Sequence, residues 1–322
     1  MAETDCPALS VVVAIVSDTA GRPDTRHLEA CLAALIRQRG APAMEIIVPH
    51  LPGMAGIAAL GEEYSNVHFV EAKDLRTYTG RSGGREHHDE LRARGLALAR
   101  GSIVALIEDH GIPAPDWSSS IHASLSPRFA AVGGAIENGV DRPLNWAVYF
   151  CDFMRYQNPV RAGESAFASD ANIAYRRAAL ESIRPVWQEK FYEPGVNEAL
   201  RSRGELVALA PDMLLYQHRQ GLRVGSALRE RFVWGRSYAA LRGRLAPHRR
   251  VLWALFSPAL PVLLLARMTA MAWKKRRTLA PYVKALPLTS ILLVSWGLGE
   301  LAGYVTGRPA RQGRAATGDS AR

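Results

Sequence analysis

Two carboxylates and an imidazole occur in a row at Glu108, Asp109 and His110, directly after the apolar run over residues 103–107. The run is short and rich in branched side chains, which predicts a buried strand. In open α/β sheets, ligands bind beyond the carboxyl ends of the strands, where these three side chains would lie. Carboxylate and imidazole ligands suit Mg²⁺ or Mn²⁺, so the cluster could hold a divalent ion, although solvated turn residues give the same pattern.

A glycine-rich basic stretch, GRSGGREHHD, covers residues 80–89 upstream of this cluster. Arg81 or Arg85 could pair there with the phosphates that a divalent ion carries. A solvated flexible loop explains the same composition. His87 and His88 are then expected to cap the region where the next helix begins.

The segments around these residues alternate between strand and helix patterns. Residues 9–16 form an apolar run rich in valine, typical of a strand buried on both faces of a parallel sheet. Residues 28–36 carry apolar side chains at helical spacing. Further strands are predicted at 45–48, 67–70, 103–107, 130–136 and 206–210, and a helix at 86–100. This alternation predicts an α/β fold with an open, mostly parallel sheet and helices on both faces.

The charge of the chain is distributed unevenly. The first 220 residues contain 22 Lys and Arg against 27 Asp and Glu, a balance of −5, whereas the last 102 contain 18 against 3, a balance of +15. The basic part also contains the longest apolar runs, so its charge favours an anionic membrane surface over nucleic acid. Three widely spaced cysteines (Cys6, Cys31 and Cys151) exclude a disulfide scaffold and fit a reducing compartment.

The C-terminal third has its own pattern. A basic helix with aromatic residues is predicted at 225–244, and an apolar segment at 251–273 is interrupted by Pro258, Pro261 and Arg267. Residues 285–305 are long enough to span a bilayer, with Glu300 as the one charge. A buried helical hairpin of a soluble protein is the alternative for both segments. Basic residues flank both of them on each side, so a re-entrant or interfacial first segment fits the positive-inside rule better than two spans.

Five motifs in order resemble those of family-2 glycosyltransferases of the membrane-associated bacterial type, and together they cover about the first 220 residues. This family has the GT-A fold and transfers a sugar from a nucleotide-sugar donor with inversion of the anomeric centre. The motifs are HLEACL at 27–32 with Gln38, RARGLALARG at 92–101, EDH at 108–110 with PDW at 115–117, FASDANIAYRR at 167–177, and FYE at 191–193 leading into a helix.

The resemblance implies roles for individual residues. Glu193 would be the catalytic base that takes the proton of the acceptor hydroxyl; outside the family context it is an ordinary acid in the first turn of a helix. A divalent metal, Mn²⁺ or Mg²⁺, would be held by Asp109, His110 and His218 and would stabilise the leaving diphosphate. The residues expected to bind the nucleotide sugar are Glu108, Asp109, Arg92, Asp170 and Asn172.

The chain departs from the family pattern at several positions. Val48-Pro49-His50 stands where two nucleotide-binding aspartates are usual, Ala93 replaces an asparagine, and His110 replaces the last aspartate of the Asp-x-Asp motif. Imidazole at that position favours Mn²⁺ over Mg²⁺. The RFVWGR segment at 231–236 differs from the QxxRW element of processive synthases, which favours transfer of a single sugar.

The expected organisation is a GT-A-like domain over 1–220, a basic juxtamembrane region over 221–250, membrane-associated helices over 251–306 and a disordered basic tail over 307–322. The expected partners are a nucleotide-sugar donor, a lipid-linked or saccharide acceptor in polysaccharide or glycolipid synthesis, and membrane lipids. The catalytic domain is expected on the cytoplasmic face of the inner membrane, since nucleotide sugars are cytoplasmic and no export signal precedes the domain.

Two other functions remain open at the level of sequence. A non-catalytic membrane scaffold could keep the fold while the acidic motifs change. A nucleotide-binding oxidoreductase is the second alternative, because Gly53, Gly56 and Gly61 follow a predicted strand. Their spacing is GxxGxxxxG and differs from the GxGxxG that binds a dinucleotide, which counts against it.

Overall fold

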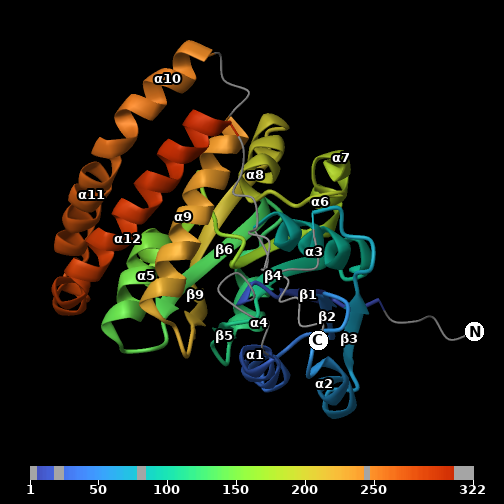
Figure 1. The fold of residues 1–322 in the computed structure, drawn as a ribbon. Helices are drawn as coiled ribbons and strands as arrows, with labels where there is room; N and C mark the ends of the chain where they lie inside the picture. Colours follow the sequence, from blue (N-terminus) through green and yellow to red (C-terminus); the bar gives the residue numbers. More distant parts are fainter. Residues whose placement is uncertain (1–5, 18–24, 78–84, 243–246, 308–322) are drawn as a thin grey trace, which may run out of the picture.

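A mixed sheet forms the centre of the molecule (Figure 1). The computed structural model describes residues 6–17, 25–77, 85–242 and 247–307. In the described chain the strands follow the order β3-β2-β1-β4-β8-β6-β9-β5, with the short β7 paired to β9. The strands are β1 (Leu9–Ala14), β2 (Met44–His50), β3 (Val67–Glu71), β4 (Ile103–Glu108), β5 (Gly111–Pro113), β6 (Phe129–Asn138), β7 (Gly163–Glu164), β8 (Asn172–Arg176) and β9 (Leu206–Gln217).

The first half of the sheet is parallel and the second half is mixed. β1 pairs in parallel with both β2 and β4, and β2 pairs in parallel with β3. β8 lies antiparallel between β4 and β6. The start of β8 therefore lies at the same edge of the sheet as the end of β4, and this edge carries the site described below.

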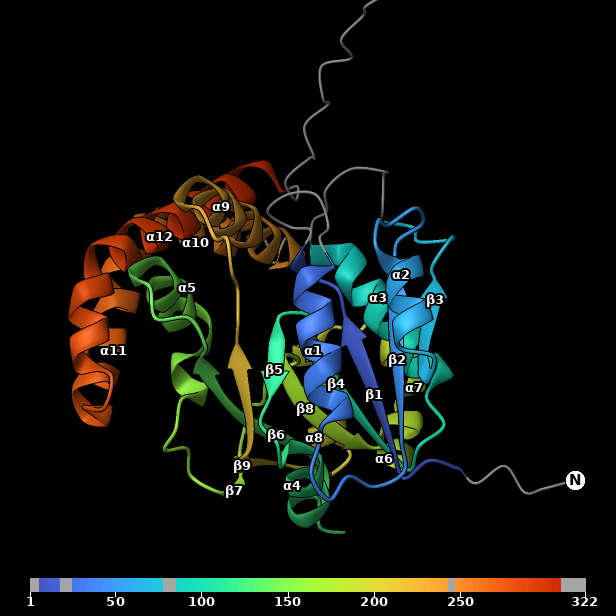
Figure 2. The same cartoon turned by 90° about the horizontal axis from the view of Figure 1, so that it is seen from below.

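Helices cover both faces of the sheet (Figure 2). On one face, α1 (Arg26–Ile36), α2 (Ile57–Glu63) and α4 (Trp117–Ser124) share a core with Val11 and Val13 of β1. On the other face, Val12 packs into a second core with α3 (Arg85–Leu98), α6 (Arg177–Ser182), α7 (Arg184–Trp187) and α8 (Glu193–Ser202). Successive side chains of β1 thus point to opposite faces, which explains its unbroken apolar sequence.

The predicted fold class is confirmed, and the predicted strands and helices are present. Sequence patterns did not predict β8 as a strand, because its five residues also fit a loop motif. β9 extends seven residues beyond the predicted end at residue 210, through Pro211. A register shift between Gly134 and Ile136 of β6 accompanies this proline, which has no N–H to donate to a ladder.

The remaining helices pack beyond one edge of the sheet. They are α5 (Pro143–Phe153), α9 (Val224–Leu241), α10 (Pro247–Phe256), α11 (Leu260–Lys275) and α12 (Leu279–Thr306). A 3₁₀ turn at Ser257–Ala259, which contains Pro258, joins α10 to α11, so the two form one outer rod (Figure 1). His248–Lys275 and Leu279–Thr306 are each 28 residues long and apolar enough to cross a membrane by length and composition.

Candidate functional site

A polar pocket opens at the edge where β1 and β4 end and β8 begins. Two walls of different origin face each other across it. The first, the sheet wall, consists of Arg92, Glu108, His110 and Asp170. The second, the helix wall, consists of Asp152, Arg219, Glu230 and Trp234. Glu193, the first residue of α8, also lines the pocket.

Arg92 connects the carboxylates of the sheet wall. Its guanidinium lies 3.1 Å from Glu108 Oε1, 3.3 Å from Asp170 Oδ2 and 3.3 Å from Asp89 Oδ1. The Arg92 side chain is 3% exposed, so these contacts are screened little by water. One cation from α3 thereby holds together the end of β4 and the start of β8.

His110 occupies a position between two carboxylates. Its Nε2 lies 3.3 Å from Glu108 Oε2, and its Nδ1 lies 3.3 Å from Asp109 Oδ1. Burial alone would lower the pKa of His110, but the hydrogen bonds and charges of Asp109 and Glu108 raise it to about 9. Against the effect of burial, His110 and Arg92 hold the pKa of Glu108 well below its usual range. The imidazolium form of His110 is therefore the stable one at neutral pH.

Asp109 supports the sheet wall from behind. Its carboxylate is fully buried and accepts hydrogen bonds from the Val16 N–H at 3.0 Å and from the Ser17 hydroxyl. These bonds and the His110 contact lower the pKa of Asp109 against the effect of burial. Asp109 therefore fixes the end of β1 and the His110 ring, and its side chain is outside the pocket lining.

Glu193 and Asp170 reach the pocket from separate elements. Glu193 begins α8, and its carboxylate accepts a close hydrogen bond from Asn197 Nδ2, one turn further along the helix. Asp170 precedes β8 and pairs with Arg92 as described. The structure thus brings together five of the predicted residues: Arg92, Glu108, His110, Asp170 and Glu193.

Three predicted residues lie elsewhere. Asp109 lies behind the sheet wall. Asn172 is fully buried, with its amide bonded to Trp117 Nε1 and to the carbonyl oxygens of Ala135 and Met213, so it positions α4, β6 and β9. The ring of His218 lies beside Gly139, away from the pocket lining.

The helix wall contains two buried ion pairs. Arg219, which follows β9, pairs through both terminal nitrogens with Glu230 of α9, at 3.1 and 2.8 Å. Arg231 of α9 pairs in the same two-pronged manner with Asp152 of α5, behind the pocket surface. Glu230 and Arg231 are each 3% exposed. These pairs attach α9 to the sheet domain.

Trp234 of α9 lines this wall and carries one polar side-chain atom. Its indole Nε1 is buried and has no hydrogen-bond partner among the described residues. The ring is held by the Arg231 guanidinium, whose Cζ lies 5.2 Å from the ring centroid. A buried donor without a partner at a pocket wall is available to a ligand oxygen.

Sequence reasoning assigned the α9 segment to the membrane surface and did not predict the helix wall. The available signal was the charge alternation Arg229-Glu230-Arg231, in which an acid amid cations requires a partner. His88 was also expected at a helix start; it lies in α3, lines the pocket and is 4.2 Å from His87 between ring centroids. The basic stretch with Arg81 falls outside the described residues, as does the predicted tail beyond Gly307.

In the described ranges, no three His, Cys, Asp or Glu side chains form a group that could hold a metal ion. Together with Asp89 and Asp109, which contact it from outside the pocket lining, the sheet wall still has a charge that favours a cation. Asp89, Glu108, Asp109 and Asp170 give −4, Arg92 and protonated His110 give +2, and the balance is −2. The donor set therefore lacks the protein ligands of a closed site but suits a divalent ion that arrives with its own anionic ligand.

The sequence matches no protein-family model and no curated protein. Among solved structures, the chain is similar to the mannosyltransferase PcManGT from Pyrobaculum calidifontis, solved with GDP-Man and Mn²⁺, at 16% identity and a TM-score of 0.51, over 92% of this chain and 88% of that one. It also matches TarS 1–349 from S. aureus at 14% identity and a TM-score of 0.46, over 89% and 90% of the two chains. The likeness to PcManGT shows a GT-A-like fold.

Proposed function

We propose that the chain is an inverting glycosyltransferase of the family-2 type, which transfers a sugar from a nucleotide-diphosphate sugar to a lipid-linked or saccharide acceptor. The observation that carries the proposal is the polar pocket itself. A carboxylate at the start of α8, Glu193, shares the pocket with the linked charges at the end of β4. The GT-A-like fold, shared with a mannosyltransferase solved with GDP-Man, supports a nucleotide sugar as the donor.

Glu193 is the proposed base. Its carboxylate takes the proton of the acceptor hydroxyl while the hydroxyl oxygen bonds to the anomeric carbon. The bond from that carbon to the diphosphate oxygen breaks at the same time, and the nucleoside diphosphate leaves with the electron pair. Because attack and departure occur on opposite sides of the carbon, the anomeric configuration inverts. Helix α8 supplies a rigid base for the carboxylate, which general-base catalysis needs.

The sheet wall is the proposed donor side. Arg92 and protonated His110 are cations that can stabilise the charge developing on the diphosphate. Since the wall has a balance of −2, we propose that a divalent ion, Mn²⁺ or Mg²⁺, accompanies the donor. Glu108 would hold it there, joined by His110 only where metal binding displaces the imidazolium proton, with Asp109 behind them, and the ion would act as a Lewis acid toward the diphosphate. Asn172 and His218 keep their assigned donor and metal roles as predictions.

The proposed organisation keeps the divisions expected from sequence: a transferase domain over 1–220, a basic region over 221–250, membrane-associated helices over 251–306 and a basic tail over 307–322. We propose that the domain works on the cytoplasmic face of the cell membrane, where its donor is found. The two 28-residue apolar helices support membrane association.

One observation favours a second candidate, a non-catalytic scaffold. Arg92 is already bound to three carboxylates, and His110 to two. A wall whose cations are all neutralised would bind a diphosphate weakly unless a metal ion came with it. The choice between the two candidates therefore depends on the metal.

The deciding experiment is a donor-hydrolysis assay of the full chain with a panel of nucleotide sugars, with Mn²⁺, Mg²⁺ or EDTA. The transferase proposal expects hydrolysis of at least one donor with a divalent ion and its loss in EDTA. Calorimetry with UDP and GDP, each with Mn²⁺, supplies a readout of binding independent of turnover. If no donor were hydrolysed and no nucleotide bound, the transferase proposal would be overturned and the scaffold would be favoured.

A further inference from the structure

The outer helices carry most of the exposed apolar side chains of the described chain. Of the 19 large hydrophobic side chains exposed on the described residues, 13 lie on α10, α11 and α12. On the outer rod, Leu255, Val262 and Leu263 are 73%, 72% and 67% exposed. On α12 the exposed side chains, from Val283 to Val305, recur at helical spacing along a single face. We call these exposed side chains of α10, α11 and α12 the apolar face.

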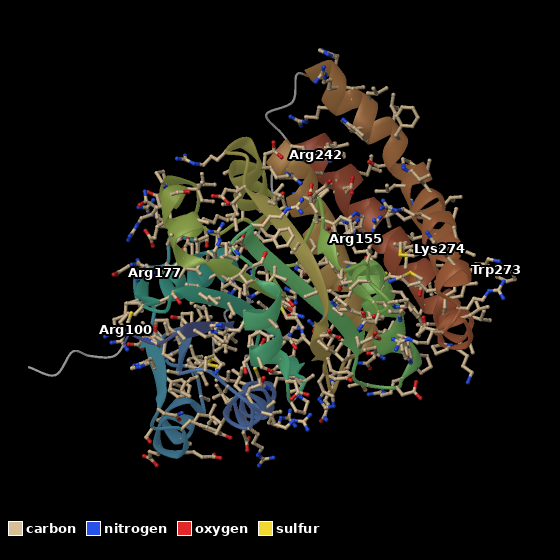
Figure 3. The ribbon with its side chains drawn as sticks, turned by 180° about the vertical axis from the view of Figure 1, so that it is seen from behind. Arg100, Arg155, Arg177, Arg242, Trp273 and Lys274 are labelled. Carbon is tan, nitrogen blue, oxygen red and sulfur yellow. The ribbon has the colours of Figure 1, made fainter. Side chains whose placement is uncertain are left out.

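The charges beside the apolar face are cationic. Arg249, Arg267, Lys274 and Lys284 are exposed on the same three helices, and Trp273 lies next to Lys274 (Figure 3). Over the described residues 247–307 the one acidic side chain is Glu300, which is 6% exposed. An apolar surface bordered by cations, without exposed acids, complements an anionic lipid surface.

The opposite side of α12 is packed along its length on α5 and α9, which are themselves bonded to β6 and to Arg219 after β9 and are counted here with the sheet domain. Near its start, the ring of Tyr282 lies 5.3 Å from that of Phe150 on α5. Further along, the Ser295 hydroxyl donates to the Leu228 carbonyl of α9 at 2.7 Å. At Gly299 and Gly303 the α12 backbone approaches that of α9 so closely that a Cβ would lie 2.2 Å from the Phe232 oxygen and 2.5 Å from the Arg236 oxygen. Helix α12 therefore lies along the domain.

The turn before α12 is also attached to the sheet domain. Lys275 donates to the Met154 carbonyl at 3.2 Å and to the Gln157 carbonyl. The Arg277 guanidinium pairs with Glu137 of β6. The domain thus contacts α12 from the turn before its start to Gly303, near its end.

We infer that the apolar face lies in the plane of an anionic membrane surface and that no helix of this group crosses the bilayer. At 1.5 Å per residue α12 is about 42 Å long, enough to cross the roughly 30 Å hydrocarbon layer. A crossing α12 would however bring the part of α9 beside Ser295 into the hydrocarbon, with Arg229 and the pocket wall. An arginine side chain near the centre of a bilayer is strongly unfavourable. An in-plane helix avoids that cost.

This arrangement differs from the span expected over residues 285–305. It deepens the proposed membrane location but rests on packing and charge, so it can fail or stand independently of transferase activity. It also places α9, whose Glu230 and Trp234 line the pocket, one helix layer from the lipid. An acceptor anchored in the same leaflet would approach the pocket from the side of the helix wall.

Vesicle flotation of the full chain tests the surface. Wild type should float with phosphatidylcholine vesicles that contain phosphatidylglycerol, and less with phosphatidylcholine alone. The double variant Leu255→Glu/Leu263→Glu should bind at least about tenfold more weakly, since it replaces two apolar side chains that would contact lipid with anionic ones. Leu98→Glu, at a site 47% exposed on α3, is the matched control and should bind like wild type. The inference would be overturned if the double variant and the Leu98→Glu control bound vesicles equally well. It would also be overturned if the chain formed a stable dimer that does not bind vesicles.

Labelling from the two sides of the membrane tests the orientation. One exposed cysteine at a time is introduced, as Ala280→Cys or Thr306→Cys near opposite ends of α12, in a Cys6→Ser/Cys151→Ser chain whose remaining Cys31 is fully buried. A membrane-impermeant maleimide is applied to right-side-out and inverted vesicles. The in-plane arrangement expects both sites to react from the same side. Reaction of the two sites from opposite sides would demonstrate a crossing helix.

Discussion

The two walls of the pocket contain the same types of charged side chain but pair them differently. In the helix wall each arginine has one carboxylate: Arg219 pairs with Glu230, and Arg231 pairs with Asp152, so the charges balance to zero. In the sheet wall, counted with Asp89 and Asp109 that contact it from behind, one arginine and one imidazolium share four carboxylates, which leaves −2 over the contacts described above. Closed pairs fix a helix in place, whereas an excess of acid attracts a further cation. We therefore predict that the helix wall serves as a joint, which attaches α9 to the rest of the protein, and that the sheet wall serves as a binding surface.

The largest effect is expected from opening a pair in the helix wall. Glu230→Gln leaves the Arg219 guanidinium largely buried without its counter-charge. Breaking a buried pair costs about 3–5 kcal/mol of unfolding free energy, and the partial exposure of Arg219 places the expected loss at the lower end. Chemical denaturation of the full chain in detergent measures it. Glu205→Gln, which removes a half-exposed pair with Arg176, is the control and should lose less than about 1 kcal/mol. Equal losses would show that the helix wall is no joint.

The contribution of the sheet wall to stability should change between pH 6.5 and 9, whereas that of the helix wall should change only in acid. The pKa of His110 is about 9 in the folded chain, above its ordinary value of 6.5. Its contribution to stability is therefore fully present below pH 6.5 and is lost as the pH rises through 9, by roughly 3 kcal/mol at about 1.4 kcal/mol per pKa unit. The pKa of Glu230 is lowered, so its contribution is lost only in acid. In EDTA, unfolding free energy should fall from pH 6.5 to 9 by roughly 3 kcal/mol more in wild type than in His110→Asn, which keeps the other groups that titrate in this range.

Turnover should depend on Glu193, whose carboxylate lines the pocket but belongs to neither wall. Glu193→Gln keeps the shape of the side chain and removes its basicity, so turnover should fall about 10²-fold or more while binding of UDP or GDP persists. Glu198→Gln, on the same helix and 67% exposed at its side chain, is the control. Transfer near the wild-type rate in Glu193→Gln would move the search for the base to Asp170.

Removing one negative charge behind the sheet wall tests whether the wall binds through a cation. Asp109→Asn keeps the bond from the Val16 N–H but weakens the hold on His110. Metal-dependent affinity for UDP or GDP should fall at least about tenfold, as for other residues that support a metal site. Calorimetry with and without Mn²⁺ measures it, and circular dichroism checks the fold. Unchanged affinity would mean that the −2 balance has no part in binding.

The difference between the walls also explains what the sequence could predict. Glu108, Asp109 and His110 directly follow an apolar strand, so their place at the sheet edge follows from local pattern, and the alternation of strands and helices predicts the sheet. The helix wall joins residues 152, 219, 230 and 234, which no local pattern brings together. The orientation of a side chain could not be predicted either. The pattern predicts that Asp109 lies at the edge, but only the packing shows that its carboxylate turns back toward Val16.

The smallest effect is expected at Trp234, where the helix wall meets the ligand. Trp234→Phe keeps an aromatic ring against Arg231 and removes the indole N–H that has no partner in the described chain. If that N–H binds the acceptor or the donor, kcat/KM for transfer should fall about fivefold, the worth of one hydrogen bond of about 1 kcal/mol, with little change in unfolding free energy. Trp146→Phe is the control, because its indole N–H binds Asp141 at 2.7 Å outside the pocket. If Trp234→Phe kept the wild-type kcat/KM, the helix wall would be a joint alone, and ligand recognition would rest on the sheet wall and Glu193.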